Sequence, residues 1–388
     1  MRPSQCANID PFLVMQVLKQ ADLRTRSGKP TWHLQVGQPG FCVPDAALHA
    51  LSDTPCSLGY SPARGRPELV ARLQRHYAAQ YDLTITQDAF FITAGSSAAF
   101  VLAFLAGFDK GAKIAIPTPG YPCYRNIING LGMHSVLFAT DHVYNFQPTL
   151  DAIECTHKTH GLQGLIIASP NNPTSTMING SQFRAIAEFC DAEGILLISD
   201  EIYHGICFDK TPDCAHAFSE NAIIINSFSK YYAMTGWRVG WMIVPQYLQD
   251  TVERLAENFF ICAPVPGQIV AEHAFDCQTE LQEYCAEYRI NRNFLIKNLP
   301  EIGISEFCHP DGGFYLYANI AHLSDNAPDF CQQCLQECGV AITPGNDFDP
   351  VHGHQFIRFS YARENTHITQ ALQVFADWVK ITHGSFCT

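Results

Sequence analysis

Short apolar segments alternate with stretches of helical periodicity through the middle of the chain, and this alternation restricts the fold more than any other feature. The apolar segments are rich in isoleucine and leucine, and a Pro, Asn, Asp or Ser ends or follows each one. Between two of them, residues 182–193 place apolar side chains at helical spacing. The order βαβα predicts an open α/β sheet of parallel strands with helices on both faces. The predicted strands are residues 113–116, 164–169, 195–199 and 223–227.

The pattern changes near residue 280, which suggests a second domain. A long helical stretch begins there, residues 312–317 then alternate like a strand, and a final helix ends near Lys380. A chain of 388 residues is also long enough for two closely packed domains. We therefore expect an N-terminal arm (1–36) that packs on the smaller domain, a large domain (37–280) and a smaller α+β domain (281–388).

The composition indicates a globular protein that does not bind nucleic acid. Apolar residues make up 47% of the chain and charged residues 16%, so a large core can form. The net charge of −13 repels phosphate backbones and anionic membrane surfaces. The 16 cysteines have no regular spacing, which favours reduced thiols. No apolar run is long enough to span a bilayer, and the first residues lack the apolar core of a signal peptide, so we expect a cytoplasmic protein without membrane contact.

The most informative motif surrounds a lysine that comes just after a predicted buried strand. Lys230 follows two serines, and Arg238 comes eight residues later. Burial and nearby cations lower the pKa of an amine and make it a nucleophile toward carbonyl groups. A solvated surface lysine is the more common case when such a residue is taken alone.

Two other polar motifs also follow predicted strands. Asp200 ends one strand, with Tyr203 three residues later, and Asn172 follows another strand. An aspartate that caps a helix and an ordinary turn are the simpler explanations. However, Asn172, Asp200 and Lys230 are separated by 28 and 30 residues, each about one βαβ unit of roughly 30 residues. They should therefore meet at one edge of the sheet, where ligands of α/β proteins bind.

A glycine-serine turn opens an apolar helix earlier in the chain. Gly95, Ser96 and Ser97 precede the apolar residues 98–105. Free backbone N–H groups at the positive end of a helix suit a phosphate. A serine N-cap is the simpler alternative.

Together these motifs resemble the class I/II aminotransferases of fold type I, an aspartate aminotransferase-like family of pyridoxal-phosphate enzymes. The similarity runs from about Pro11 to the final helix, and it rests on motifs in the family's order. The resemblance implies a large domain with a mostly parallel, seven-stranded-type sheet covered by helices, plus a smaller α+β domain. The motifs are Gly-x-Pro (37–39), Tyr-Ser-Pro-x-x-Gly (60–65), Asn-Pro-Thr (172–174), Asp-Glu-x-Tyr (200–203) and Ser-x-Ser-Lys-x-x-x-x-x-Gly-x-Arg-x-Gly (227–240).

The resemblance also implies roles for individual residues. Lys230 should hold pyridoxal 5'-phosphate as a Schiff base and move the proton at the substrate α-carbon. Asp200 should keep the pyridine nitrogen protonated, which makes the ring an electron sink. Asn172 and Tyr203 should bind the ring oxygen, and Tyr121 should stack on the ring. The expected phosphate ligands are Gly95, Ser96, Ser97, Ser227 and Arg238.

Three further residues are expected at the substrate and subunit contacts. Arg358 matches the arginine that binds the substrate α-carboxylate through its planar fork. Gly37 should let its backbone approach the same carboxylate, beside Asn172. The residue that matches Tyr60 reaches the phosphate of the neighbouring subunit in this family, so the resemblance implies a homodimer with shared active sites.

Departures from the family pattern point to the substrate. Acid-specific members of the aspartate-type subgroup tend to have a lysine at the position of Ser97 and a threonine at that of Val14. An apolar side chain cannot pair with a second buried carboxylate. We therefore expect a transferase of nitrogenous groups (EC 2.6.1) that acts in amino acid metabolism and moves an amino group from a neutral, aliphatic or aromatic L-amino acid to a 2-oxo acid.

Other activities share the same apparatus. A carbon-sulfur β-lyase is the main alternative, and ring closure to 1-aminocyclopropane-1-carboxylate is another, because all of these reactions start from the same carbanion. The sensor half of a transcription regulator is a candidate from another class, but no basic helix-turn-helix segment precedes the fold. A protein that keeps the fold without the cofactor is also disfavoured, because the cofactor-binding residues are present.

Two local features have simple structural explanations. Ser175 stands where the family usually has glycine, so the turn there either avoids positive φ or is strained. Cys331, Cys334 and Cys338 fall on one helix face, and with no fourth ligand nearby we expect them to pack in the core. No metal is predicted.

Overall fold

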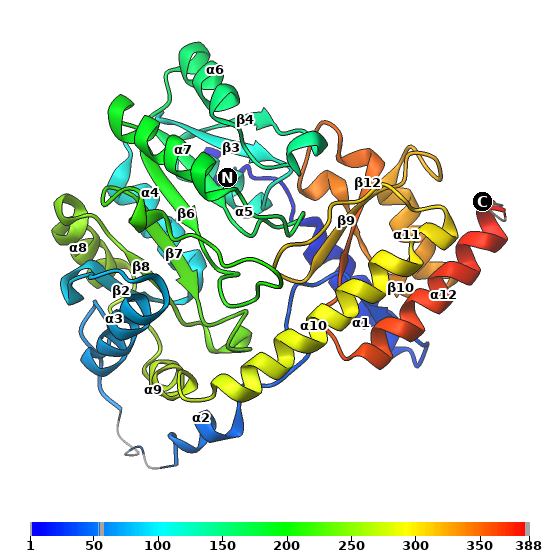
Figure 1. Cartoon of the computed structure of the whole chain (residues 1–388), viewed down its shortest axis with the longest axis horizontal. Coiled ribbons are helices and arrows are strands. Elements are labelled where there is room, and N and C mark those ends of the chain that lie inside the picture. Colours follow the sequence, from blue (N-terminus) through cyan, green and yellow to red (C-terminus); the bar gives the residue numbers. More distant parts are fainter. Residues whose placement is uncertain (1, 53, 55–57, 385–388) are drawn as a thin grey trace.

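The computed structural model describes residues 2–52, 54 and 58–384, and it confirms the predicted α/β fold (Figure 1). Its main sheet has seven strands in the order β2-β8-β7-β6-β5-β3-β4. Only β8 runs antiparallel to its neighbours β2 and β7. The strands are β2 (Phe90–Thr93), β3 (Lys113–Thr118), β4 (His134–Ala139), β5 (Gly164–Ala168), β6 (Leu196–Asp200), β7 (Ile223–Ser227) and β8 (Gly240–Ile243).

Helices pack on both faces of this sheet, as the sequence pattern predicts. Strand β7 shows why, because Ile224 joins one apolar cluster while its neighbours Ile223 and Ile225 join the other. The first cluster includes residues of α3 (Pro67–Tyr81), α6 (Leu150–His160), α7 (Gly180–Glu193) and α9 (Val265–Ala274). The second includes residues of α4 (Gly95–Gly107), α5 (Pro122–Gly130) and α8 (Gln249–Phe259).

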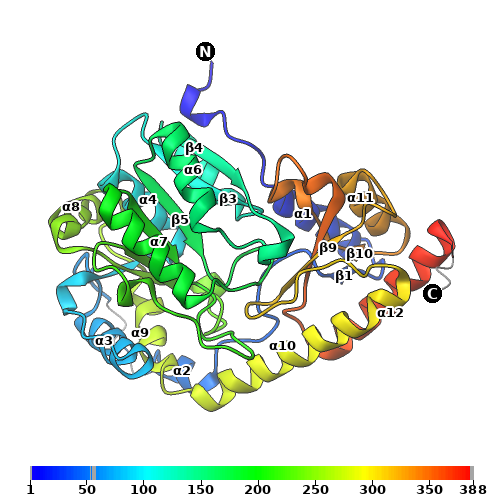
Figure 2. The same cartoon turned by 45° about the horizontal axis from the view of Figure 1, so that its top comes forward.

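A smaller antiparallel sheet stands beside the main one, in the order β11-β12-β9 (Figure 1). The long helix α10 (Gln278–Asn298) runs from the main sheet to this part of the molecule (Figure 2). The predicted boundary at residue 280 lies inside this helix. The other elements here are β9 (Tyr315–Asn319), α11 (Ala327–Glu337), β10 (Val340–Ala341), β11 (Thr343–Pro344), β12 (Phe356–Ser360) and α12 (Asn365–His383).

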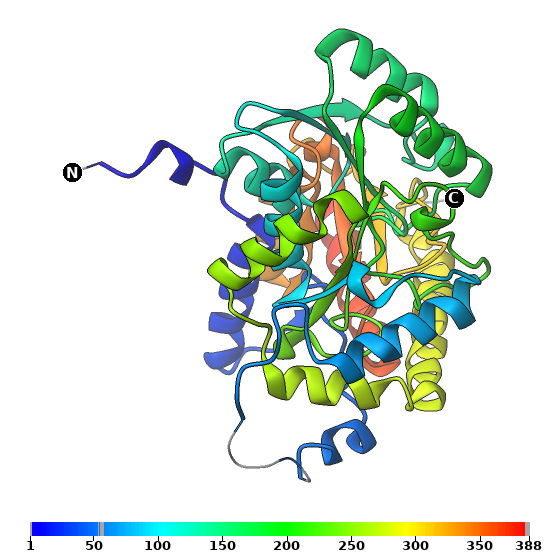
Figure 3. The ribbon, with the colours of Figure 1, turned by 90° about the vertical axis from the view of Figure 1, so that its left-hand side faces the viewer.

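The N-terminal part of the chain lies against the smaller sheet. Helix α1 (Leu13–Arg26) contacts β10 and β11, and β1 (Trp32–His33) pairs in parallel with β10. The chain ahead of α1 projects from the body (Figure 3). The short helix α2 (Asp45–His49) then contacts α9.

Two sequence expectations need adjustment. The strand expected over residues 312–317 begins only at Tyr315, because Gly313 turns the chain with a φ of +63°. Cys331 and Cys334 are buried on α11, whereas Cys338 follows the helix and is only partly buried. No helix among the described residues is both long and apolar enough to cross a membrane.

Candidate active site

The predicted polar residues meet at one edge of the main sheet. Strands β5, β6 and β7 are parallel, so the segments that carry Asn172, Asp200 and Lys230 leave the sheet at the same edge. Tyr121 follows the parallel strand β3 at this edge. These four side chains line a cavity of about 320 Å³, which we name the substrate cavity.

Asp200 lies at the floor of the substrate cavity. Its side chain is only 5% exposed, and it accepts hydrogen bonds from the Tyr124 hydroxyl and, at 3.1 Å, from the backbone N–H of Ile202. Burial raises the pKa of Asp200 to about 6, although the bonds from Tyr124 and Ile202 and the nearby Lys230 charge oppose the shift. A positively charged partner would therefore be strongly favoured at this carboxylate.

Lys230 faces the same cavity with an amine that loses its proton easily. Burial, followed by the positive charges of Arg358 and Arg238, lowers the pKa of Lys230 to about 8. Its Nζ donates a hydrogen bond to the carbonyl oxygen of Gly37 at 2.6 Å. Gly37 must be glycine, since a Cβ there would lie 1.5 Å from the hydroxyl of Tyr315. The amine is thus positioned and activated as a nucleophile.

The start of α4 forms one corner of the cavity, with features that suit an anion. Ser96 and Ser97 line the cavity, together with Arg238 and Ser229. No side chain caps this helix, whose N-cap residue is Ala94, so the serine N-cap alternative does not apply. Gly95 has a φ of +74°, and a Cβ there would lie 2.3 Å from an Arg238 nitrogen. Backbone N–H groups and an arginine therefore converge where a phosphate could bind.

Arg358 reaches the cavity from strand β12 and is almost fully buried. Its guanidinium lies between two aromatic rings, 4.2 Å from the Tyr315 centroid and 4.6 Å from that of Phe348. It donates hydrogen bonds to Oδ1 of Asn172 at 2.7 Å and to the carbonyl oxygen of Gln35 at 2.5 Å. Its Nε has no hydrogen-bond partner among the described residues. A buried, fixed cation with an unused donor can bind a carboxylate.

Helix α1 supplies an apolar wall. Val14, Met15 and Leu18 line the cavity from this helix, and Phe12 lines it from the preceding residue. The carboxylate of Asp347 fixes the start of the helix by accepting hydrogen bonds from the backbone N–H groups of Leu13 and Val14, both at 3.1 Å. The side chain of a bound substrate would meet aliphatic groups here.

The structure brings most of the predicted site residues to this cavity and leaves three outside its lining, namely Gly95, Ser227 and Tyr60. Ser227 is buried behind Ser229, and its hydroxyl donates to Ser229 Oγ at 2.8 Å or to the Val239 carbonyl oxygen at 3.0 Å. Tyr60 is 82% exposed and lines a separate surface cavity. The predicted residues in the lining are Gly37, Ser96, Ser97, Tyr121, Asn172, Asp200, Tyr203, Lys230, Arg238 and Arg358, with Gly95 adjacent.

Sequence reasoning missed several residues of the site. Tyr124 bonds to Asp200, and its position three residues after Tyr121 at the start of a helix was an available signal. Tyr315 bonds to the hydroxyl of Tyr203 at 2.9 Å and packs on Arg358. Gln35 uses only its carbonyl oxygen at Arg358, which no side-chain pattern reveals.

The Ser175 turn adopts the strained alternative. Ser175 has a φ of +58° and is fully buried. Its Oγ accepts a hydrogen bond from the backbone N–H of Tyr315 at 3.0 Å, and its carbonyl oxygen accepts from Asp311 at 2.8 Å and Gly312 at 3.0 Å. The residue therefore connects the Asn172 loop to the start of β9.

Comparison with known proteins identifies the family. The model of "Aminotransferase class I and II" matches residues 31–375. The chain belongs to the class I and II aminotransferases. It is 42% identical to the valine–pyruvate aminotransferase of Mycobacterium tuberculosis, over 96% of this chain and 97% of that protein. It is 33% identical to the (5-formylfuran-3-yl)methyl phosphate transaminase of Methanocaldococcus jannaschii, over 96% of this chain and 98% of that protein.

Solved structures of aminotransferases agree closely with this fold. A crystal structure of an aminotransferase from Mycobacterium tuberculosis superposes with a TM-score of 0.94 at 42% identity, covering 98% of this chain and all of that chain. Aspartate aminotransferase from Thermus thermophilus with maleate gives a TM-score of 0.90 at 25% identity, covering 97% and 100%. The protein therefore has the aspartate aminotransferase-like arrangement of fold type I.

Class I and II aminotransferases use pyridoxal phosphate, and the residues of the substrate cavity fit this group. The fit rests on three chemical features of the site. A buried carboxylate at Asp200 suits a protonated ring nitrogen, an amine of lowered pKa at Lys230 suits an aldehyde, and the α4 N-terminus beside Arg238 suits a phosphate.

Proposed function

We propose that this aminotransferase moves an amino group between a neutral, preferably aliphatic, L-amino acid and a 2-oxo acid such as pyruvate. The apolar wall of α1 is the observation that carries the proposal. The cavity-lining cations of the described chain are Lys230, Arg238 and Arg358, and each has another task in the proposal. No cation of the lining is therefore left to pair with a second carboxylate of the substrate. Burying such a carboxylate against Val14 and Met15 without a counter-ion would be costly.

We assign the following tasks to this chain's own residues. Lys230 carries the cofactor and then moves a proton to and from the substrate α-carbon. Asp200 faces the pyridine nitrogen, Asn172 and Tyr203 face the ring oxygen, and Tyr121 lies against the ring. Bound pyridoxal phosphate supplies the electron sink for the carbanion. The phosphate contacts are Gly95, Ser96, Ser97 and Arg238, with Ser227 supporting Ser229.

The substrate carboxylate is assigned to Arg358. The guanidinium is held by two rings and two hydrogen bonds, so it needs little reorganisation to bind an anion. Gly37 lines the same cavity, and because it has no side chain the hydroxyl of Tyr315 can lie against its backbone. The α-carboxylate then fixes the substrate so that its side chain points toward α1.

We further propose a homodimer in which Tyr60 contacts the phosphate bound by the neighbouring subunit. An 82% exposed tyrosine outside its own substrate cavity supports this assignment. Sedimentation should give twice the mass of one chain, and Tyr60→Phe should weaken cofactor retention while Tyr247→Phe, at another exposed tyrosine, should not. A monomer at assay concentration would contradict the proposal.

The relative named valine–pyruvate aminotransferase supports an aliphatic donor, whereas relatives named aspartate aminotransferase, at 27% and 28% identity, raise the acidic alternative. A steady-state panel of valine, leucine, alanine, phenylalanine and aspartate with pyruvate decides between them. We expect kcat/KM to be highest for valine or leucine. A higher value for aspartate than for every neutral donor would overturn the proposal.

The same assays distinguish the carbon-sulfur lyase. A transaminase needs a 2-oxo acid to complete its turnover, because the amino group stays on the cofactor until the acceptor takes it. A lyase releases pyruvate and ammonia from cystathionine with no acceptor present. Sustained release of that kind, faster than transamination of valine, would replace the proposed activity with lyase activity.

A further inference from the structure

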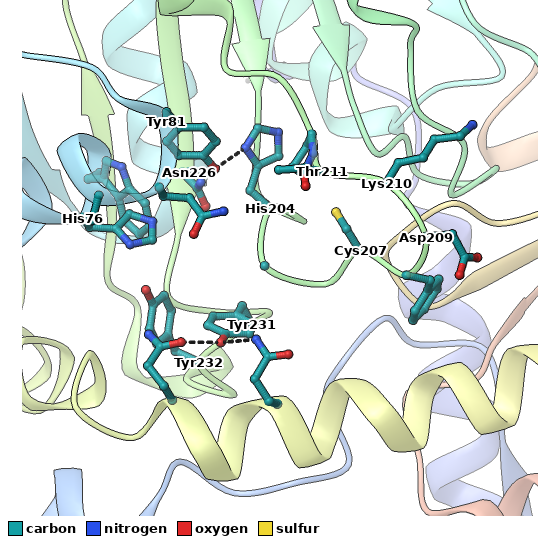
Figure 4. Close-up of a pocket in the computed structure, with 18 residues that line it drawn as sticks. His76, Tyr81, His204, Cys207, Asp209, Lys210, Thr211, Asn226, Tyr231 and Tyr232 are labelled. Carbon is teal, nitrogen blue, oxygen red and sulfur yellow. Dashed lines mark hydrogen bonds between the residues drawn. The ribbon is translucent and has the colours of Figure 1, made fainter.

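A second cavity, of about 550 Å³, lies behind the active site, and we name it the rear cavity (Figure 4). Its walls come from α3, the loop at residues 204–212, strands β7 and β8, and the first turns of α10. It is adjacent to the substrate cavity in the chain, since Tyr203 and Lys230 line one cavity whereas His204 and Tyr231 line the other. None of the assigned tasks above uses it.

Several aromatic rings contribute to the walls of the rear cavity. Rings from four different elements surround the space, so a flat molecule could pack against more than one of them. A volume of this size also falls in the usual range for small-molecule pockets, roughly 300–1,000 Å³. The rings belong to His76, Tyr81, Phe208, Tyr231, Tyr232 and Trp241.

An amide donor of a buried residue faces the cavity without a partner among the described residues. Asn226 is 5% exposed, and its Oδ1 accepts a hydrogen bond from the N–H of Ser227 at 2.7 Å. Its NH₂ group makes no hydrogen bond with the described residues and points into the cavity (Figure 4). Tyr232 is also buried and lines the cavity, and its hydroxyl makes no hydrogen bond with the described residues. A ligand with an acceptor group in this cavity would give these donors a hydrogen-bond partner.

The other polar groups deep in the cavity are already engaged. His204 Nε2 lies 3.0 Å from the carbonyl oxygen of Ser169 and must donate to it, which leaves Nδ1 to accept from the Tyr81 hydroxyl at 2.8 Å. The Tyr231 hydroxyl donates to Gln278 Oε1 and accepts from Gln282 Nε2, both at 2.9 Å (Figure 4). Among the buried residues of the lining, Asn226 and Tyr232 are therefore the ones whose donors have no hydrogen-bond partner in the described part of the chain.

The charges of the lining are already neutralised. Lys210 pairs with Asp311 at 3.1 Å, and Asp209 pairs with Arg289 at 3.1 Å and Arg292 at 2.9 Å. Both histidines are neutral at pH 7, because burial lowers the pKa of His76 to about 4 and that of His204 to about 3. A charged ligand would lose its hydration without gaining a counter-ion, which is costly.

We propose that the rear cavity binds a small uncharged aromatic molecule that carries a hydrogen-bond acceptor, such as the carbonyl oxygen of a carboxamide. The ring packs among the tyrosines, and the acceptor takes the free N–H of Asn226. Neither contact involves the cofactor or the substrate, so the site is separate from the substrate cavity.

Calorimetric titration of the pyridoxal phosphate-loaded enzyme with nicotinamide tests the proposal. We expect saturable binding with a Kd in the millimolar range or below. Nicotinate has the same ring but a charged carboxylate, and it should bind at least about ten-fold more weakly because its charge has no partner. Equal binding of both compounds, or no saturable binding of nicotinamide, would overturn the proposal.

A matched pair of variants on α3 locates the bound molecule. Ala79 and Ala78 are both exposed, but only Ala79 lines the rear cavity. Ala79→Trp should fill the space and weaken nicotinamide binding at least about ten-fold, whereas Ala78→Trp should leave it unchanged. Unchanged binding in Ala79→Trp would place the molecule elsewhere and refute the assignment.

A third variant tests the hydrogen-bonding part without altering the shape of the cavity. Tyr232→Phe removes only the hydroxyl, so the ring packing stays, and we expect about a three-fold weaker Kd for nicotinamide. The cofactor absorbance and the transamination rate of each variant, measured without nicotinamide, report whether it has folded. If Tyr232→Phe and Ala79→Trp both fold and both bind like the parent enzyme, the rear cavity is not the site.

Discussion

The two ends of the substrate cavity are built in different ways. At the end formed by the main sheet, Asp200 and Lys230 have pKa values that burial shifts toward neutrality, to about 6 and about 8. At the end formed by the smaller sheet and α1, Arg358 is clamped between two rings beside an apolar wall. Asp200 and Lys230 at the first end can therefore gain or lose protons near neutral pH. Arg358 at the second end keeps its positive charge and is suited only to binding an anion.

This difference suggests a division of tasks between the two sheets. Groups that must change protonation lie on segments that follow parallel strands, where the surrounding backbone is fixed and burial tunes their pKa values. The groups that we assign to substrate recognition, Arg358 and the apolar wall of α1, come from elements outside the main sheet. Substitutions at the first end should therefore affect the chemical step, and substitutions at the second should affect binding and selectivity.

The largest effect is expected at Lys230. Lys230→Ala removes the amine to which we assign both cofactor attachment and transfer of the α-proton, so kcat should fall by about four orders of magnitude. Steady-state transamination assays with the preferred amino donor measure this fall in kcat. Lys158→Ala, at an α6 lysine far along the chain from the site, is the control and should keep full activity. A loss below ten-fold in Lys230→Ala would show that another group does the chemistry.

The pH dependence of cofactor loading should report the lowered pKa of Lys230. Only the neutral amine attacks an aldehyde, and with a pKa of about 8 its neutral fraction rises about fifty-fold between pH 6 and pH 8. The rate constant for reconstituting the cofactor-free enzyme with pyridoxal phosphate, followed by absorbance, should rise by this factor and level off above pH 8. A rate that still rises ten-fold per unit between pH 8 and pH 10 would indicate an ordinary lysine.

Arg358→Lys tests the binding end. A lysine keeps the charge but loses the planar fork and the ring contacts, which should cost about 2 kcal/mol of carboxylate binding. We expect KM for the amino donor to rise about thirty-fold with a much smaller change in kcat. Arg184→Lys, an arginine that packs on Phe218 away from the cavity, controls for the loss of a cation–π contact. A fall in kcat with unchanged KM would reverse the division proposed above.

The sequence predicted the main-sheet end better than the binding end. Asn172, Asp200 and Lys230 follow parallel strands about one βαβ unit apart, so spacing alone places them at one edge. The α/β class and the parallel strands could be predicted for the same reason. Ser229 rather than Ser227 lines the cavity, and spacing does not show which of two alternate hydroxyls faces inward.

The binding end depends on contacts between distant segments. Tyr315 and Phe348 enclose Arg358 although they are far apart in the chain, and Gln35 acts through its backbone. Asp347 fixes α1 across more than 330 residues of sequence separation. Such contacts arise from packing among elements of the smaller-sheet part of the molecule, and no local pattern encodes them.

Val14 should affect selectivity rather than rate. Val14→Ala removes two methyl groups from the apolar wall, so the ratio of kcat/KM for valine to that for alanine should fall about ten-fold. Val17→Ala makes the same change on the same helix, but Val17 packs against Ala21, Leu335 and Ala341 instead of lining the cavity. The ratio should be unchanged there. An equal change in both variants would mean that α1 acts through its stability and not through substrate contact.

The smallest effect is expected at Ser175, which joins the two ends. Its φ of +58° is unfavourable for serine, but its Oγ accepts the hydrogen bond of the Tyr315 N–H. Ser175→Ala keeps the strain and loses the bond, which should cost about 1–2 kcal/mol. Ser175→Gly loses the same bond but relieves about 1 kcal/mol of strain, so it should be nearly neutral.

Thermal unfolding of the two Ser175 variants, at equal protein and cofactor concentrations, measures this difference. The glycine variant should unfold at a temperature close to that of the parent enzyme, and the alanine variant should unfold a few degrees lower. If glycine lowers the midpoint as much as alanine does, the strain at residue 175 is negligible. The hydrogen bond to Tyr315 would then be the only contribution of this side chain to the join between the two sheets.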